Sequence, residues 1–414
     1  MEMREELRGI ARRAIESVLP DRAVREELSR REISDPVRIL AFGKASWRMA
    51  RAAVEVLGKR VKGGIAITKR GHSQGPIEGI EVWEASHPVP DESSVSATRR
   101  ALELMEGLSE GETVLLLISG GGSALFELPA EGVSLEEIRE VTEALLRGGA
   151  TIGELNAVRK RLSAVKGGRL GEMLRPARVL ALVLSDVVGD RLDTIASGPA
   201  HPDGTTAEEA LRIASRYGLK LSPAALEALR RETPKRLEHV ETVVVGNLLK
   251  ACATAMEEAS RLGYSPFSLT THLEGEAREV GLLFASAAKS ALAGSSSLRR
   301  PCALVAGGET VVRVRGKGRG GRNQELALSF ALSVEGLEGV ALLSLGTDGT
   351  DGPTDAAGAV VDGGTARRIR EAGLDPQALL EDNDSYRALQ AAGDLLFTGP
   401  TGTNVNDVVV LLVR

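Results

Sequence analysis

Two short turns combine glycines with residues that can hold an anion. The first, Ser119-Gly120-Gly121-Gly122-Ser123, follows an almost wholly apolar segment. Consecutive glycines let a backbone approach an anion closely and offer it successive N–H donors, whereas a purely structural turn seldom needs three of them. The second turn contains Lys44, whose ammonium is either a phosphate ligand or an ordinary surface charge. We predict that Ser119 to Ser123 bind phosphate, and Lys44 is a candidate for the same site.

A third turn is strongly basic and precedes a predicted helix. It runs from Arg313 to Asn323 and contains five basic residues. Gly316, Gly318 and Gly321 satisfy the dinucleotide pattern G-x-G-x-x-G, but such a turn needs little positive charge. Arginines among glycines fit a multiply charged phosphate better, and a solvated basic face is the remaining alternative. Gly321 is therefore predicted to bind phosphate.

Two other well-known site patterns are excluded. A Walker A loop would need Gly in place of Arg38 and Ser or Thr in place of Ala45. One G-x-S-x-G match, at residues 71–75, lacks the helix that a nucleophile elbow requires. The sequence therefore predicts neither a P-loop nor a serine esterase.

Carboxylates follow other apolar segments. Asp186 ends the apolar stretch 179–185, where a charge has no packing role, so it could hold Mg²⁺ or accept a proton from a hydroxyl. Asp348 and Asp351 lie in one tight loop, without the spacing of an EF-hand. They are predicted metal ligands, and the alternative is that they only form Asx turns. Cations, backbone donors and carboxylates together indicate phosphoryl transfer, although they do not name the acceptor.

The elements that must position these residues alternate along the chain. Strands that are apolar throughout, separated by amphipathic helices, are typical of an α/β protein whose parallel sheet is covered on both faces. A polar segment near residues 233–239 suggests a boundary between domains 1–236 and 237–414. The predicted strands are 37–42, 64–68, 113–119, 179–185, 242–245, 340–345 and 408–413, with a hairpin of 303–306 and 310–314. The predicted helices are 1–18, 46–57, 94–107, 135–147, 154–165, 248–262, 274–293 and 323–334.

Composition narrows the class of protein further. The net charge of −5 gives no support to binding of nucleic acid or a membrane surface. No apolar run approaches the roughly 20 residues that span a bilayer. The two cysteines, Cys252 and Cys302, form no metal motif and suit a reducing compartment. We therefore expect a cytoplasmic protein that binds a small molecule, and the sequence leaves open whether it forms a homodimer.

Several segments resemble the class II glycerate kinases, the glycerate 2-kinase family whose carboxyl-terminal region is called the MOFRL domain. The matches extend from near the amino terminus to the last predicted strand. They are 43–45, 87–91, 118–123, 156–160, 166–168, 184–186, 197–199, 307–309, 320–325, 346–349, 351–355, 383–386 and 398–407.

This resemblance implies a reaction and a fold. The reaction is transfer of the γ-phosphoryl group of ATP, with Mg²⁺, to the 2-hydroxyl of D-glycerate, which yields 2-phosphoglycerate. The fold is two α/β domains, a Rossmann-like domain with a largely parallel sheet and a second domain with a mixed sheet, with the active site in the cleft between them. The rival functions are an NAD(P)H-dependent hydroxypyruvate reductase and a non-catalytic binding protein for a small phosphorylated acid.

The matched segments also imply roles for individual residues. Lys44 and Arg322 match the positions to which the family's catalytic charge stabilisation is assigned, and Asp186 is the candidate for orienting the acceptor hydroxyl or the metal. Lys166 is placed with the nucleotide and phosphate ligands. The residues placed with the substrate are Asn156, Arg159, Asn323 and Glu309.

Overall fold

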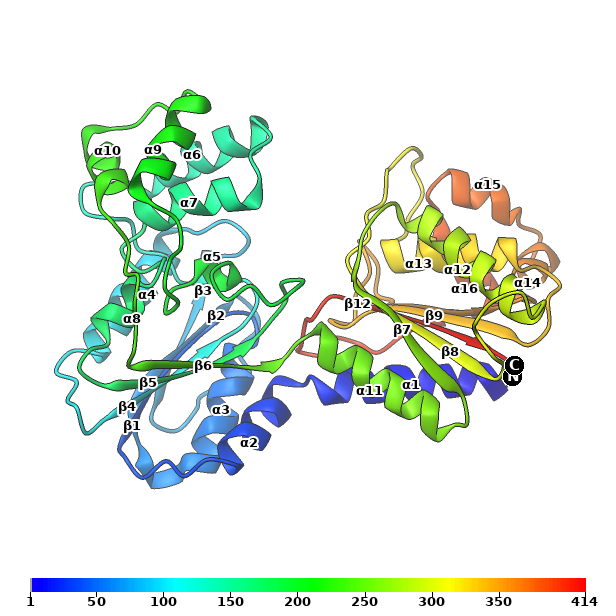
Figure 1. Ribbon diagram of the computed structural model, residues 1–414, viewed down its shortest axis with the longest axis horizontal. Coiled ribbons are helices and arrows are strands. Elements are labelled where there is room, and N and C mark those ends of the chain that lie inside the picture. Colours follow the sequence, from blue (N-terminus) through cyan, green and yellow to red (C-terminus); the bar gives the residue numbers. More distant parts are fainter. Residues whose placement is uncertain (1) are drawn as a thin grey trace. The chain divides into compact units, whose positions relative to one another are not determined.

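The computed structural model describes residues 2–414, which form two compact units. The central unit comprises residues 20–245, and the terminal unit joins residues 2–19 to residues 246–414. Each unit is built on its own six-stranded sheet with helices on both sides (Figure 1). The α/β class predicted from the sequence is confirmed. No helix within residues 2–414 is both long and apolar enough to cross a membrane.

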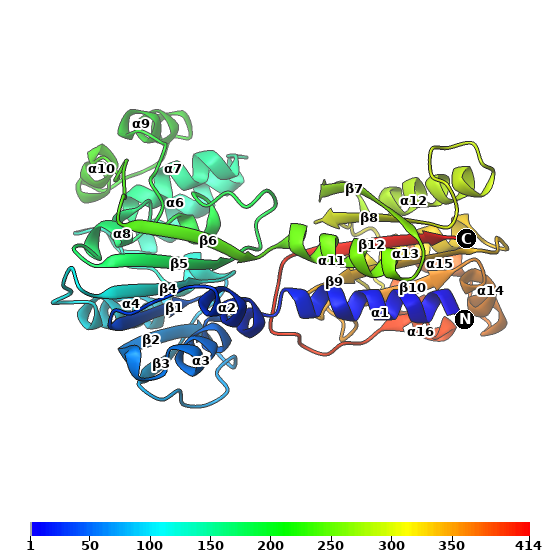
Figure 2. The same cartoon turned by 60° about the horizontal axis from the view of Figure 1, so that its bottom comes forward.

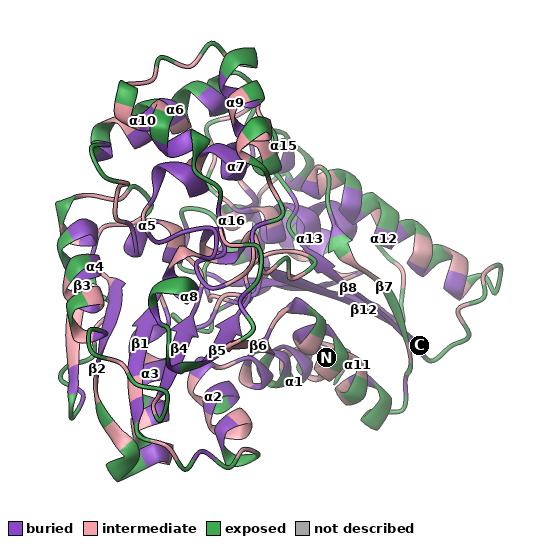
Figure 3. Ribbon diagram, turned by 60° about the vertical axis from the view of Figure 1, so that its left-hand side comes forward, coloured by how far each residue is buried: buried purple, intermediate pink, exposed green. Residues whose placement is uncertain are grey.

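The sheet of the central unit has the order β3-β2-β1-β4-β5-β6. The pairs β1–β2, β1–β4, β2–β3 and β4–β5 are all parallel, as the apolar strands predicted. Its middle strands are buried on both faces (Figure 3). The strands are β1 (Val37–Phe42), β2 (Val61–Lys69), β3 (Ile80–Ala85), β4 (Thr113–Ile118), β5 (Arg178–Leu184) and β6 (Val240–Gly246).

Helices of the central unit form two groups. One group covers the sheet: α4 packs on β2 and β3, while α3 packs on β1 and β2 beneath α2. The other group, α6, α7, α9 and α10, has a separate apolar core of its own (Figure 1). The helices are α2 (Pro20–Ser29), α3 (Ser46–Leu57), α4 (Glu92–Leu104), α5 (Gly122–Leu125), α6 (Leu135–Arg147), α7 (Ile152–Leu162), α8 (Arg169–Met173), α9 (Ala207–Arg216) and α10 (Pro223–Arg230).

The terminal unit has a mixed sheet of the order β11-β10-β9-β12-β8-β7. The last strand, β12, lies between β8 and β9 and is antiparallel to both, whereas β7 and β8 are parallel. A mixed second sheet was predicted and is confirmed. The strands are β7 (Ser265–Leu273), β8 (Cys302–Gly308), β9 (Val340–Gly346), β10 (Gly358–Asp362), β11 (Leu395–Leu396) and β12 (Asp407–Val413).

Helices cover both faces of this mixed sheet. Helices α1 and α11 pack together on one face, and α12 and α13 form an apolar core with the other face (Figure 2). The helices are α1 (Glu2–Ser17), α11 (Leu248–Arg261), α12 (Ala277–Leu292), α13 (Arg322–Ser333), α14 (Thr365–Glu371), α15 (Pro376–Glu381) and α16 (Ser385–Ala392).

The compact units do not coincide with the predicted segments 1–236 and 237–414. Helix α1 lies in the terminal unit, where the Thr403 hydroxyl donates a 2.7 Å hydrogen bond to the Val18 carbonyl. Strand β6, which we expected to begin the second domain, is instead the last strand of the central sheet. An apolar strand has the same periodicity in either sheet, so its pattern does not report which neighbour it pairs with.

The predicted hairpin of 303–306 and 310–314 is wrong. Residues 303–306 lie in β8, but residues 310–314 form no strand, and Val311 and Val314 are exposed. The physical reason is that β8 already has a neighbour on each side, β12 and β7, so neither edge is free for a hairpin partner. Strand β7 was missed, because most of its residues are not buried and its apolar pattern is weak.

Candidate functional site

The glycine turn and Lys44 lie side by side in the central unit. Strands β1 and β4 pair in parallel up to Phe42 and Ile118, so the residues that follow them emerge at the same sheet edge. The pairing continues past the strands, because the Lys44 amide donates a 2.9 Å hydrogen bond to the Gly120 carbonyl. The Ala45 amide donates to the Ser119 hydroxyl at 3.0 Å. The structure thus brings together two features that the sequence showed 75 residues apart.

Other side chains lie close to the first two glycines of this turn, in the space that a Cβ would occupy. A Cβ on Gly120 would come within 2.2 Å of Oδ2 of Asp186, which follows the neighbouring strand β5. Gly121 has φ +82°, and its Cβ would lie 2.9 Å from Cδ2 of His87 and 3.2 Å from Cγ of Lys44. Glycine is therefore required here for backbone conformation and for space. Asp186, His87 and Lys44 gather around the turn, and His87 was not among the predicted site residues.

The backbone of the turn offers donors that the protein does not use. Among the residues that the structure describes, the amides of Gly120, Gly121 and Ser123 have no hydrogen-bond partner. Successive N–H groups in such a conformation form an anion-binding concavity. The geometry therefore supports the phosphate-binding prediction for Ser119 to Ser123.

Lys166 supports this turn from behind. Its ammonium donates to the carbonyls of Ser123 and Phe126, both at 2.9 Å, and lies 3.2 Å from the Glu127 carboxylate. The side chain is only 1% exposed, and this burial lowers the pKa of Lys166. Because the three N–H donors of the ammonium match these three acceptors, Lys166 in this structure holds the turn in place. Its predicted contact with a bound phosphate stays a prediction.

Asn156 and Arg159 lie three residues apart on α7, on the same face of the helix. Neither side chain makes a hydrogen bond to the described part of the chain, and Nε of Arg159 is buried without a partner. Burial lowers the pKa of Arg159, and the charge of Glu127 opposes that shift. A desolvated guanidinium without a bound anion is energetically costly. These two residues therefore suit the carboxylate of a small acid.

A turn with unusual backbone angles touches the glycine turn from the other side. Ala196 and Ser197 have φ values of 50° and 63°, which non-glycine residues rarely adopt. The Ser197 hydroxyl lies 3.1 Å from that of Ser123, and the Ser197 carbonyl accepts from the Gly167 amide at 3.1 Å. Strained residues of this kind persist only where their surroundings hold them, and they cluster at binding sites.

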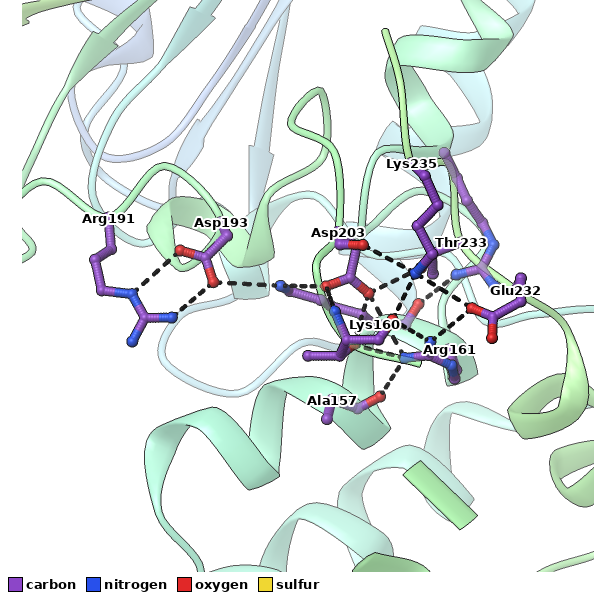
Figure 4. Close-up of polar contacts among 11 residues, drawn as sticks. Ala157, Lys160, Arg161, Arg191, Asp193, Asp203, Glu232, Thr233 and Lys235 are labelled. Carbon is purple, nitrogen blue, oxygen red and sulfur yellow. Dashed lines mark hydrogen bonds and ion pairs between the residues drawn. The ribbon is translucent and has the colours of Figure 1, made fainter. Parts of the chain in front are cut away.

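A buried ionic network of the central unit centres on Asp203 (Figure 4). Asp203 accepts hydrogen bonds from Lys160 at 3.1 Å and from Thr233 at 2.9 Å, and Arg161 lies 3.6 Å away. Burial alone would raise the pKa of Asp203, but the charge of Lys160 and the hydrogen bonds from Thr205 and Lys160 hold it below its usual range. Sequence analysis missed the network, because Lys160 and Arg161 on a helix usually lie on the surface.

We expect Asp203→Ala to lower the free energy of unfolding by about 3–5 kcal/mol, because Lys160 and Arg161 would remain buried without their anion. Urea denaturation followed by circular dichroism measures the change. The matched control is Asp193→Ala, since Asp193 lies 3.8 Å from Lys160 but is 30% exposed; its loss should be below about 1 kcal/mol. Equal losses in the two variants would contradict the structural role of Asp203.

Arg322 occupies the corresponding place in the terminal unit, at the start of α13. Its Nε and Nη2 donate to the two carboxylate oxygens of Asp407 at 2.5 and 3.1 Å, and Nη1 donates to Glu309 at 2.8 Å. Because β12 is antiparallel to both neighbours, Asp407 begins it directly opposite Gly308 and Gly346, where β8 and β9 end. The sheet thus fixes the position of the carboxylate that holds Arg322.

This ion pair keeps a charged guanidinium at the sheet edge. Burial would lower the pKa of Arg322, but Asp407 and Glu309 raise it. Burial raises the pKa of Asp407 to about 6, although Arg322 opposes that shift. The Arg322 side chain remains 32% exposed, so a fixed positive charge faces solvent.

The other predicted residues near α13 have structural contacts. Asp351 accepts from the amides of Asn323 and Gln324 at 3.1 and 2.9 Å, so it satisfies donors at the helix start. A Cβ on Gly321 would lie 2.2 Å from Cγ of Asp351, which explains the glycine. The Asn323 side chain accepts from the Ser344 hydroxyl at 2.6 Å and is buried. Its predicted substrate contact therefore gains no support from this geometry.

Asp348 forms the local turn that was the alternative to metal binding. Its Oδ1 accepts from the amide and hydroxyl of Thr350 at 3.0 and 3.2 Å. Within residues 2–414, no group of three or more His, Cys, Asp or Glu side chains could hold a metal ion. The two predicted metal ligands, Asp348 and Asp351, thus form no metal cage of protein atoms.

The basic turn at 313–323 does not cradle a ligand with its backbone. The amides of Arg315 and Gly316 donate to Asn383 Oδ1 at 2.7 and 3.0 Å, and the Arg319 amide donates to Asp384 Oδ1 at 3.1 Å. A Cβ on Gly316 would lie 2.3 Å from the Asp382 carbonyl oxygen. These glycines allow close packing against residues 382–385, and no strand precedes them. The structure therefore also rules out a dinucleotide turn here.

The fold and the sheet edges define a two-domain α/β protein in which each unit places a positively charged side chain beside a glycine-rich turn. Residues 6–230 match a family described as a domain of unknown function, DUF4147, and residues 302–407 match the MOFRL family. A D-glycerate 2-kinase from Thermotoga maritima is 56% identical over 98% of this chain and 97% of its own. The chain therefore belongs to the glycerate kinase family that carries a MOFRL domain.

Two further relatives are informative, one for its fold and the other for the name that it carries. A crystal structure of a glycerate kinase from Thermotoga maritima superposes with a TM-score of 0.97 at 54% identity, and the match covers 100% of both chains. It confirms the two-domain fold. A protein of Agrobacterium vitis named as a putative hydroxypyruvate reductase is 44% identical over 91% of this chain and 98% of its own.

Proposed function

We propose that this protein transfers the γ-phosphoryl group of ATP to the 2-hydroxyl of D-glycerate and releases 2-phosphoglycerate. The observation that carries the proposal is the set of unused amides at Gly120, Gly121 and Ser123 beside Lys44, in a chain whose relatives include glycerate kinases. ATP as a substrate agrees with the cytoplasmic location expected from composition. A product spectrum tests it: ¹³C and ³¹P NMR after incubation with D-glycerate and MgATP should show phosphate on carbon 2.

Residues of the central unit would bind and orient both substrates. The glycine turn donates backbone N–H groups to phosphate oxygens, and the Lys44 ammonium neutralises charge there. Arg159 donates to the glycerate carboxylate as a planar fork, with Asn156 alongside. Asp186 lies against Gly120, where its carboxylate can accept the proton of the attacking hydroxyl.

In the terminal unit, Arg322 is the residue that stabilises the transferring phosphoryl group. Asp407 and Glu309 already orient its guanidinium, so little reorganisation is needed when negative charge develops. Phosphoryl transfer depends chiefly on such positioned charges, because the protein forms no covalent bond to the substrate.

Mg²⁺ would enter this site with the nucleotide. Mg²⁺ commonly binds through one or two carboxylates together with substrate phosphates and water, so a protein cage is not required. Asp351 does not fit this role, because both of its oxygens accept from the start of α13. Asp348 is half-buried on its turn, where Oδ1 accepts from Thr350, and it fits as a single ligand. The ion supplies charge neutralisation of the ATP phosphates.

The rival reductase is not favoured. It would need a nicotinamide site, and the G-x-G-x-x-G match at residues 316–321 is packed against residues 382–385. A non-catalytic binding protein would not release ADP steadily when glycerate and MgATP are present. The product spectrum therefore separates the kinase from both rivals, and a fall in NADH absorbance with hydroxypyruvate would identify the reductase.

We expect Lys44→Ala and Arg322→Ala each to lower kcat by about 10²–10³-fold, the loss seen when one charge-stabilising donor is removed. Steady-state ADP release measures the change. Arg322→Lys is the second variant, since it leaves a positive charge near the buried Asp407 but loses the two-pronged contact. The control is Lys317→Ala, at an exposed lysine of the basic turn. Turnover near that of the wild type in either alanine variant would contradict these roles.

We expect Arg159→Gln to raise the KM for D-glycerate about 10–100-fold, because a hydrogen bond to a charged group contributes about 1.5–3 kcal/mol. The KM for ATP should change little. Initial rates with each substrate varied in turn measure both constants. Arg147→Gln, at an exposed position of α6, is the control. A larger effect on ATP than on glycerate would place Arg159 in the nucleotide site instead.

A further inference from the structure

We propose that His87 is a further phosphate-binding residue, whose Nε2–H donates a hydrogen bond to a phosphoryl oxygen bound at the Gly120–Ser123 turn. This inference rests on the proposed function and deepens it, because it adds a side chain to the phosphate subsite. The phosphoryl group belongs either to the nucleotide or to the phosphorylated acid, and the experiment below distinguishes these two sources.

The His87 ring lies against the glycine turn. His87 follows β3, an edge strand of the central sheet, yet its ring lies against the turn that follows β4. A Cβ on Gly121 would be 3.1 Å from Nε2 and 2.9 Å from Cδ2 of His87. The ring edge that carries Nε2 is thus in contact with the glycine whose amide is unused, beside the stem of Lys44.

The imidazole of His87 has no hydrogen-bond partner among residues 2–414, although the side chain is partly buried. Neither nitrogen is among the fully buried atoms that lack a partner, so the ring edge remains accessible to a ligand. His239, for comparison, places Nε2 2.8 Å from the Gly171 carbonyl. A set of donors that converge without an acceptor indicates that an anion completes the site.

The charges around His87 are mostly positive and therefore favour an anion there. Burial, together with the charges of Lys44, Lys69 and His72, lowers the pKa of His87 to about 4. Two carboxylates lie on neighbouring elements: Glu84 near His72, and Asp186 against Gly120. The imidazole is therefore neutral at pH 7, with one N–H to donate. A bound phosphoryl dianion reverses the local field and raises the pKa of His87. Since the complex then holds its proton more tightly, phosphate binding should strengthen as the pH falls toward the raised pKa.

Three substitutions test the proposal. Gln can place an amide donor near the position of Nε2, whereas Asn reaches only as far as Nδ1 and Ala removes both. We expect His87→Ala and His87→Asn to weaken phosphate binding about tenfold or more, and His87→Gln to recover most of the affinity. The probes are ADP and 2-phosphoglycerate, each titrated by calorimetry. His272→Gln, at an exposed histidine of the terminal unit, is the control.

A second measurement reports the contact directly in the wild-type protein. The Cε1–H resonance of His87, assigned from the His87→Gln spectrum, is followed against pH with and without each probe. A rise in the pKa of His87 with ADP assigns the subsite to the nucleotide, and a rise with 2-phosphoglycerate assigns it to the acid. An unchanged pKa with both probes, together with wild-type affinity in His87→Ala, would overturn the inference. Product formation by the wild type would then still support the kinase function.

Discussion

The hydrogen bond from the Lys44 amide to the Gly120 carbonyl fixes the position of the glycine turn for which we propose phosphate binding. It extends the β1–β4 ladder beyond the ends of both strands, so the sheet determines where the glycine turn begins. Gly43 must lack a side chain, since a Cβ there would lie 2.2 Å from the Ser119 hydroxyl. That hydroxyl in turn accepts from the Ala45 amide. The turn is thus part of the rigid sheet edge rather than a loop that closes on its ligand.

Aromatic packing and a buried lysine keep the turn rigid on the side that faces the protein core. Phe42 and Phe126 stack with ring centroids 4.3 Å apart, and Lys166 donates to the Ser123 carbonyl. The strained residues Ala196 and Ser197 press against the same turn. Strain and buried charge both lower stability, so their presence around the turn fits our proposal that its N–H donors are held in place for a ligand. A flexible turn would have to be ordered when phosphate binds, at the expense of affinity.

Much of the fold could be predicted because its elements carry strong local signals. Strand 37–42 and helices 46–57 and 135–147 were predicted with the bounds that the structure shows. The hairpin at 303–314 failed because two nearby apolar runs fit either a hairpin or a strand followed by a loop. The neighbours of β8 decide between them, and they are β12, about a hundred residues later, and β7. Pairing between strands that are far apart in the sequence is not visible in the local pattern of residues.

The site was harder to predict than the fold, because glycine serves two purposes that look alike in a sequence. In the turn at 119–123 three amides find no acceptor among residues 2–414, whereas in the turn at 313–323 glycine lets residues 382–385 pack closely. Lysine is equally ambiguous. Lys160 and Lys166 are buried and paired with Asp203 and Glu127, so their charges are already balanced. Lys44 makes no ion pair with any residue among 2–414 and stands beside unused amides. The surroundings of Lys44 therefore differ from those of the two buried lysines, and this difference is the physical basis for proposing that Lys44 binds the phosphate.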